Sequence, residues 1–113
     1  MKKTYAEFGI PSDDIEATRI RVEALFGEEL SGVSSDTWGL YYTSENWSKD
    51  NVIRVYTNFS PDYGEGFWNA PDHKQLPLIL EISRSPNFDE IHELVMSDTT
   101  LGAVLISRDE IDV

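Results

Sequence analysis

The hydrophobic residues in the first quarter of the chain recur with the period of an α-helix. Ser12 or Asp13 can cap the free amides at its start, and Glu16 follows Asp13 at the spacing of a capping box. Gly27 is typical of the left-handed residue that ends a helix. The pattern therefore predicts a helix over residues 13–26. The positions that share its buried face are Ile15, Thr18, Val22, Leu25 and Phe26.

Hydrophobic and polar residues alternate in two later segments, which is the pattern of half-buried β-strands. These segments are residues 38–43 and 52–59, and the polar residues 44–51 between them predict an antiparallel hairpin. The apolar run 76–82 predicts a central strand, and residues 101–106 predict a last strand. The positions that share one side of a strand are Trp38, Leu40 and Tyr42, then Ile53, Val55 and Phe59, then Leu78, Leu80 and Ile82.

The remaining segments carry less regular patterns. Asn87 and Glu90 repeat the capping spacing, and the hydrophobic residues after them predict a second helix over residues 88–97. The first ten residues are interpreted as an arm or a short edge element. Residues 28–35 have room for a short extra strand, which we do not count. Residues 60–75 are broken by prolines and glycines and predict a long loop.

These elements together predict an α+β fold in a single domain, residues 1–113. Their order is α-β-β-β-α-β, with a mostly antiparallel sheet of about four strands and two helices on one of its faces. The length of 113 residues is that of one ordinary domain with one core.

The composition excludes several classes of function. The chain has 21 Asp and Glu against 9 Lys and Arg, a formal net charge of −12, so nucleic acid or an anionic membrane would meet net repulsion. Cysteine is absent, which removes disulfides and thiolate chemistry. No apolar stretch approaches the roughly 20 residues of a membrane span, and the first residues have no signal-peptide core. We therefore expect a small, soluble, cytoplasmic protein.

The patterns that would indicate catalysis or metal binding are weak. His92 and Glu93 begin like a zinc-protease motif, but Met96 stands where that motif needs its second histidine. His73 follows Asp72, which alone does not define a catalytic base. Adjacent carboxylates are frequent, yet at helix starts they mainly favour the helix dipole. We therefore expect no catalytic residues, no metal site and no cofactor.

The most informative segment is residues 62–72, which sets aromatic residues among acids. Tyr and Trp are enriched at binding hot spots, and carboxylates around them would steer a basic partner. The alternative is that Phe67 and Trp68 fold back onto the core as a plug. The residues that we expect to bind a partner are Asp62, Tyr63, Glu65, Phe67, Trp68, Asp72, Glu90 and Glu93.

The negative charge is also unevenly placed along the chain. Half of the net charge of −12 lies in residues 85–113. One interpretation is a solvated helix face followed by a frayed acidic tail. The other is an electronegative surface that imitates the phosphate backbone expected by a basic nuclease.

Small size, acidity, the absence of cysteine and the aromatic–acidic segment 62–72 together resemble a known class of proteins. They are similar to the small cytoplasmic immunity proteins of bacterial polymorphic toxin and contact-dependent growth inhibition systems. The resemblance implies a tight one-to-one complex with a cognate toxin domain, commonly a nuclease, and no enzyme activity. We therefore expect a non-enzymatic inhibitor that is monomeric when free and neutralises a basic toxin domain.

Two other functions stay open from the sequence. A small-ligand-binding domain or an enzyme would have a pocket under the 60–75 loop, floored by Tyr41, Tyr42 and Tyr56. A homodimeric adaptor domain would pair through an exposed strand such as residues 101–106.

Overall fold

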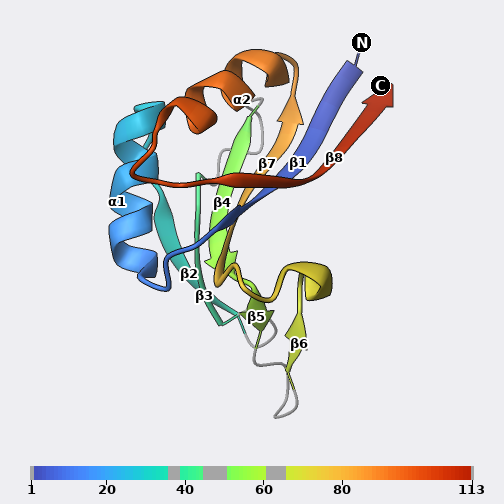
Figure 1. The fold of residues 1–113 in the computed structure, drawn as a ribbon. Coiled ribbons are helices and arrows are strands. Elements are labelled where there is room, and N and C mark those ends of the chain that lie inside the picture. Colours follow the sequence, from blue (N-terminus) through green and yellow to red (C-terminus); the bar gives the residue numbers. More distant parts are fainter. Residues whose placement is uncertain (1, 36–38, 45–50, 61–65, 113) are drawn as a thin grey trace.

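The computed structural model describes residues 2–35, 39–44, 51–60 and 66–112, and these residues form an antiparallel sheet with helices packed against it (Figure 1). Within these ranges the main sheet has six strands in the order β2-β3-β4-β7-β1-β8, and a short hairpin, β5–β6, stands apart from it. The elements are β1 (Lys2–Ile10), α1 (Ile15–Phe26), β2 (Ser31–Ser35), β3 (Gly39–Thr43), β4 (Val52–Thr57), β5 (Phe59–Ser60), β6 (Phe67–Trp68), the 3₁₀ turn η1 (Pro71–His73), β7 (Leu78–Ser85), α2 (Phe88–Ser97) and β8 (Val104–Asp112).

The α+β class and the antiparallel character of the sheet are confirmed, but the predicted strand number and order are wrong. The first ten residues are an interior strand, β1, which pairs antiparallel with β7 on one side and β8 on the other. Ala6, Phe8 and Ile10 alternate inward from this strand and are all buried. The segment 28–35, which the prediction did not count, contains β2, the outer neighbour of β3.

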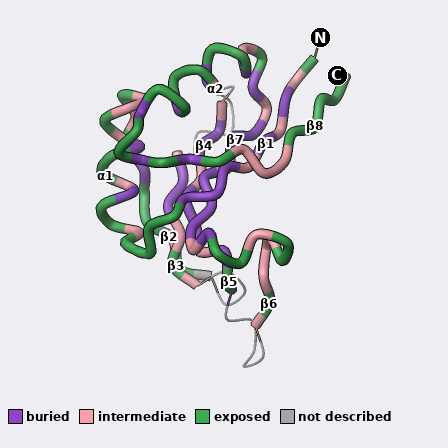
Figure 2. Tube along the Cα trace, viewed as in Figure 1, coloured by how far each residue is buried: buried purple, intermediate pink, exposed green. Residues whose placement is uncertain are grey.

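One hydrophobic core joins the sheet to α1 and α2. Phe8, Val55 and Leu80 point from three neighbouring strands toward Val22 of α1 and Val95 of α2, and all five are almost completely buried. Since the side chains of a strand alternate between its faces, these inward positions define one helix-covered face and leave the other face of the sheet without a helix. Figure 2 shows the buried residues gathered along β4, β7 and β1, with most of β8 exposed.

The predicted first helix is confirmed apart from its start. Asp14, and not Ser12 or Asp13, caps α1, because its Oδ1 accepts a hydrogen bond from the amide of Ala17 at 3.0 Å. Ser12 instead accepts from the amide of Asp14 at 3.1 Å. Gly27 ends the helix in the left-handed conformation, with φ of 67°, as predicted.

An ion pair between the buried carboxylate of Asp98 and Arg21 connects the end of α2 to α1. Asp98 is only 8% exposed, and it accepts hydrogen bonds from Arg21 Nε and from the amides of Thr100 and Leu101. The hydrogen bond from Arg21 is the main cause that holds the pKa of Asp98 below its usual value. The same contact raises the pKa of Arg21. Asp98 therefore links α2 to α1 through Arg21, and it also accepts the hydrogen bonds of two backbone amides in the turn that follows α2.

The acidic C-terminal segment is a strand and not a frayed tail. The last strand runs over Val104–Asp112 instead of the predicted 101–106, and its register sets Lys2 opposite Asp112 and Lys3 opposite Ile111. Lys2 Nζ also lies 3.9 Å from a carboxylate oxygen of Glu110. The basic first residues of β1 thus offset part of the acidic charge of β8, which favours this pairing.

Candidate partner-binding surface

The short β5–β6 hairpin projects beyond one end of the main sheet (Figure 1), and its two described strands carry aromatic side chains. We call Phe59, Phe67 and Trp68 the aromatic tip. Phe59 is 44% exposed, Phe67 is 37% exposed and Trp68 is half-buried. The rings of Phe59 and Trp68 meet edge to face with centroids 5.3 Å apart. The tip therefore presents aromatic surface outside the core, and the alternative in which Phe67 and Trp68 both fold back onto the core as a plug does not hold, since neither packs against the core cluster.

A buried asparagine holds the chain behind the tip. Asn58 is 0% exposed, and its Nδ2 donates to the carbonyl oxygens of His73 at 3.0 Å and Leu76 at 2.9 Å. Its Oδ1 accepts from the amide of Ala70 at 2.8 Å. Because this side chain satisfies donors and acceptors of a loop that has no strand partners of its own, it replaces the hydrogen bonds of regular structure there.

A second asparagine fixes the two strands of the hairpin to each other. Asn69 Nδ2 donates to the carbonyl oxygen of Thr57 at 3.1 Å and to Ser60 Oγ at 2.9 Å, while its amide donates to the carbonyl oxygen of Asn58 at 2.7 Å. Asn58 and Asn69 together set the position of the aromatic tip before any partner binds. A surface that is already ordered loses less entropy on binding.

An apolar groove of about 410 Å³ lies between the tip and the end of the main sheet. Lys74 crosses it with its ammonium group 5.5 Å from the centre of the Trp68 ring, within the range of a cation–π contact. The residues that line the groove are Asp13, Thr57, Phe59, Trp68, Lys74, Pro77 and Leu78.

The predicted partner-binding residues are divided between two ends of the molecule. Phe67 and Trp68 form part of the tip, and Asp72 is exposed in η1 just after them. Glu90 and Glu93 are exposed on α2, at the opposite end of the molecule from β6 (Figure 1). The other three predicted residues, Asp62, Tyr63 and Glu65, lie outside the described residues.

Sequence reasoning missed Phe59 because it assigned this residue to the core side of a strand over residues 52–59. In the structure β4 ends at Thr57, and Asn58 turns the chain so that Phe59 leaves the main sheet. The signal that could have indicated this is Asn58 itself, since Asn is depleted in strands and frequent in turns.

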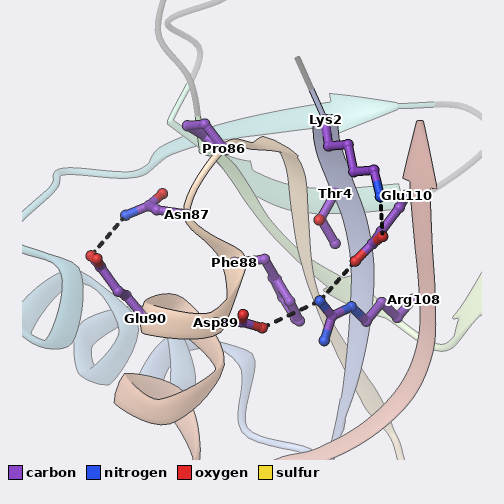
Figure 3. A pocket seen from close by; sticks show the side chains of 9 residues that line it. All are labelled: Lys2, Thr4, Pro86, Asn87, Phe88, Asp89, Glu90, Arg108 and Glu110. Carbon is purple, nitrogen blue, oxygen red and sulfur yellow. Dashed lines mark hydrogen bonds and ion pairs between the residues drawn. The ribbon is translucent and has the colours of Figure 1, made fainter. Parts of the chain in front are cut away.

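Glu90 lines a second hollow, of about 340 Å³, between the start of α2 and the ends of β1 and β8 (Figure 3). Arg108 lies at its centre, with Nη2 at 3.3 Å from Asp89 Oδ1 and at 2.9 Å from Glu110 Oε1. The guanidinium carbon of Arg108 lies 4.9 Å from the centre of the Phe88 ring. Asn87 donates to Glu90 at 3.3 Å. The acids of this hollow are therefore largely engaged within the chain, and exposed pairs of this kind contribute little energy.

The groove beside the tip is not floored by the tyrosines that the enzyme interpretation named. Tyr42 belongs to the core, and the guanidinium carbon of Arg19 lies 5.1 Å from the centre of its ring. Tyr56 points to the helix-free face, where its hydroxyl donates a hydrogen bond to Glu7 at 3.1 Å. Neither lines the groove beside the tip, nor does Tyr41.

The two histidines make different contacts in the structure. The backbone carbonyl oxygen of His73 accepts from Asn58, and the His92 ring stacks on Phe88 with centroids 5.7 Å apart. Among the residues that the structure describes, no three His, Asp or Glu side chains gather closely enough to hold a metal ion. In the same ranges no helix combines the length and the hydrophobicity that crossing a membrane requires.

No family model matches this chain, and no curated protein or solved structure matches it either.

Proposed function

We propose that this protein is a non-enzymatic inhibitor of the immunity type, which binds and neutralises a basic toxin domain, most naturally a nuclease. The observation that carries the proposal is the aromatic tip, which is exposed and yet held in place by Asn58 and Asn69. Large aromatic side chains on a preorganised support are the features from which binding hot spots are made.

The charge of the chain supports a basic partner. The formal net charge is −12, and Asp72, Glu90 and Glu93 are exposed acids that would contribute to a long-range attractive field. Such a field raises the rate of encounter with a cationic protein and weakens as salt is added. The tip would supply the binding energy of the contact, and the surrounding negative field would raise the association rate.

The test begins by identifying the neighbouring gene, since the proposal expects it to encode a protein with a basic C-terminal toxin domain. That domain is then co-expressed with this protein, and growth and binding are measured. The double variant Phe67→Ser with Trp68→Ala should abolish protection and weaken binding by roughly 30-fold or more, the effect of losing a single hot spot. Ile20→Ser is the matched control, since Ile20 is a 58% exposed apolar residue on α1. If the double variant protects cells and binds as well as the control, the proposal is wrong.

A second candidate, binding of a small apolar ligand, is favoured by the groove of about 410 Å³ beside the tip. Ligand sites commonly fall between about 300 and 1,000 Å³. Thr57→Trp would fill this groove from its rim, because Thr57 is half-buried there. Asp13→Trp narrows the same groove from the side of α1, where Asp13 is exposed and does not belong to the tip. If the inhibitor proposal is correct, Asp13→Trp should still protect cells, whereas a ligand-dependent activity would be lost in both variants.

A further inference from the structure

The helix-free face of the main sheet contains a hollow of about 200 Å³ between β4, β7, β1 and β8. Four residues cross these strands in a single row, because the register pairs Arg54 with Glu81, Glu81 with Glu7, and Glu7 with Ser107. The side chains at the hollow, which we call the open-face hollow, are those of Tyr5, Glu7, Tyr56, Glu81, Ser107 and Asp109.

Two carboxylates stand directly opposite each other in this row, which is an unfavourable arrangement in a sheet. Arg54 compensates Glu81, with its Nη1 at 2.9 Å from the carboxylate, and Ser83 donates to the same oxygen at 2.8 Å. Glu7 has a different environment. Among the described residues it accepts only from hydroxyl groups, those of Tyr56 at 3.1 Å and Ser107 at 3.2 Å. Within the part of the chain that the structure describes, no cation pairs with this carboxylate where it faces the hollow.

The walls of the hollow are polar groups fixed in position. Tyr56 is 4% exposed, and burial together with the charges of Glu81 and Glu7 raises its pKa, so its hydroxyl stays protonated and donates to Glu7. Tyr5 is half-buried and lies opposite Asp109 on β8, which adds a third carboxylate at the rim. Among the described residues that line the hollow there are three carboxylates and no cation. Arg54 pairs with Glu81 from β4, and Lys3 lies two residues before Tyr5 on β1, both outside the lining.

The open-face hollow is also close to the aromatic tip. Tyr56 belongs to β4, and Phe59 follows it by three residues, so their Cα atoms are at most roughly 11 Å apart. An ordinary protein interface covers about 800 Å² on each partner, which is wide enough to include both. A partner bound at the tip would therefore lie over or beside this hollow.

We infer that the open-face hollow receives an arginine side chain of the basic partner, next to Glu7 and against the Tyr5 ring. Arginine is the residue that fits, because its planar guanidinium can bond a carboxylate with two parallel N–H groups and stack on an aromatic ring. The inference rests on the proposed function for the identity of the partner, and on charge complementarity at Glu7 for the occupant. It assigns the binding of cations to the helix-free face and not to the acids of α2.

The test uses a peptide probe with alternating arginine and glycine and a matched peptide with neutral citrulline in place of arginine. In a titration followed by amide chemical shifts at low salt, the arginine peptide should move the signals of Tyr5, Tyr56 and Ser107 most. Glu7→Gln should weaken this binding by about threefold to fivefold, the contribution of one partly exposed ion pair. Glu29→Gln removes the same charge from an exposed position between α1 and β2 and should leave the affinity within about 1.5-fold.

Three results would overturn the inference. The first is an equal loss of affinity in Glu7→Gln and Glu29→Gln, and the second is an equal response to the citrulline peptide. The third is that the same signals shift with protein concentration alone, which would make a second copy of the chain the occupant. The proposed function is tested separately, since it depends on the tip variant and the toxin domain. A failure there with the peptide result intact would reject the toxin partner and still support an arginine site.

Discussion

The role of Asn58 leads to a quantitative prediction. Asn58→Ala removes the hydrogen bonds to the carbonyl oxygens of His73 and Leu76 and from the amide of Ala70. Three hydrogen bonds contribute about 1 kcal/mol each, and leaving buried partners such as the Leu76 carbonyl unsatisfied adds a further 1 kcal/mol or so. We therefore expect the free energy of unfolding to fall by about 3–5 kcal/mol, unless the loop behind the tip detaches first.

The assay combines urea unfolding with amide hydrogen exchange. Urea gives the global loss, and exchange at Asn69, Ala70 and Leu76 reports whether the loop opens locally, since their amides are bonded in the parent. Gln75→Ala is the control, because Gln75 is an exposed residue of the same loop and should change stability by no more than about 0.5 kcal/mol. A loss below about 1 kcal/mol in Asn58→Ala, with exchange unchanged, would refute the role given to this side chain.

Asn58→Asp provides a sharper version of the same test. The new carboxylate could still accept from the amide of Ala70. Its other oxygen, however, would replace the Nδ2 donor of the parent and would face the carbonyl oxygens of His73 and Leu76 without a hydrogen to share. Burial without donors raises the pKa of a carboxyl group. The variant should therefore be less stable than Asn58→Ala at neutral pH and should recover as the pH falls and the carboxyl is protonated. Equal pH dependence of the two variants would contradict the hydrogen-bond assignment.

Three further predictions follow from other parts of the molecule. Because Arg21 lowers the pKa of Asp98 in the folded protein, this contact stabilises the fold fully above the usual Asp pKa of 3.8, and its contribution is lost as the pH falls through the lower folded pKa. The urea midpoints of the parent and Asp98→Asn should therefore differ most at pH 5 and converge in stronger acid. Gly66→Ala should displace the tip, because φ of Gly66 is 73° and an added Cβ would collide with the Phe59 ring. We expect changed tryptophan fluorescence and weaker partner binding, and an unchanged affinity would contradict this prediction. The β8 edge is exposed but rich in charge, which opposes edge pairing, so light scattering should give a monomer at high concentration.

The sequence predicted the elements whose signals are local. The helix ending at Gly27 and the helix beginning at Phe88 each have a period and a boundary signal within a few residues, and both helices are found. The predicted cap of the second helix is wrong, because the Asn87 side chain accepts no bond from the helix amides and donates to Glu90 instead. The interior position of β1 could not be predicted in this way. Lys2–Ile10 is stabilised by pairing with residues about 70 to 110 positions away, and a local pattern contains no information on such partners.

The candidate site was predicted in the same uneven way. The aromatic residues Phe67 and Trp68 stood out by type, and they lie at the tip. Phe59 joins them only because Asn58 ends β4, and Glu90 is separated from them because α2 lies at the other end of the sheet. The open-face hollow was not predicted at all. Its row depends on the register that sets Glu7 beside Glu81, and register is a property of paired strands and not of either sequence alone.

The interior place of β1 has a consequence for how the protein is made in a cell. A ribosome synthesises Lys2–Ile10 well before both neighbours of this strand, Leu78–Ser85 and Val104–Asp112. Until both have emerged, the nascent chain exposes Phe8 and two unpaired strand edges, a state that invites aggregation and chaperone binding. The sheet is therefore expected to assemble only after β8 has left the ribosome, and every function that depends on the folded sheet is delayed until then.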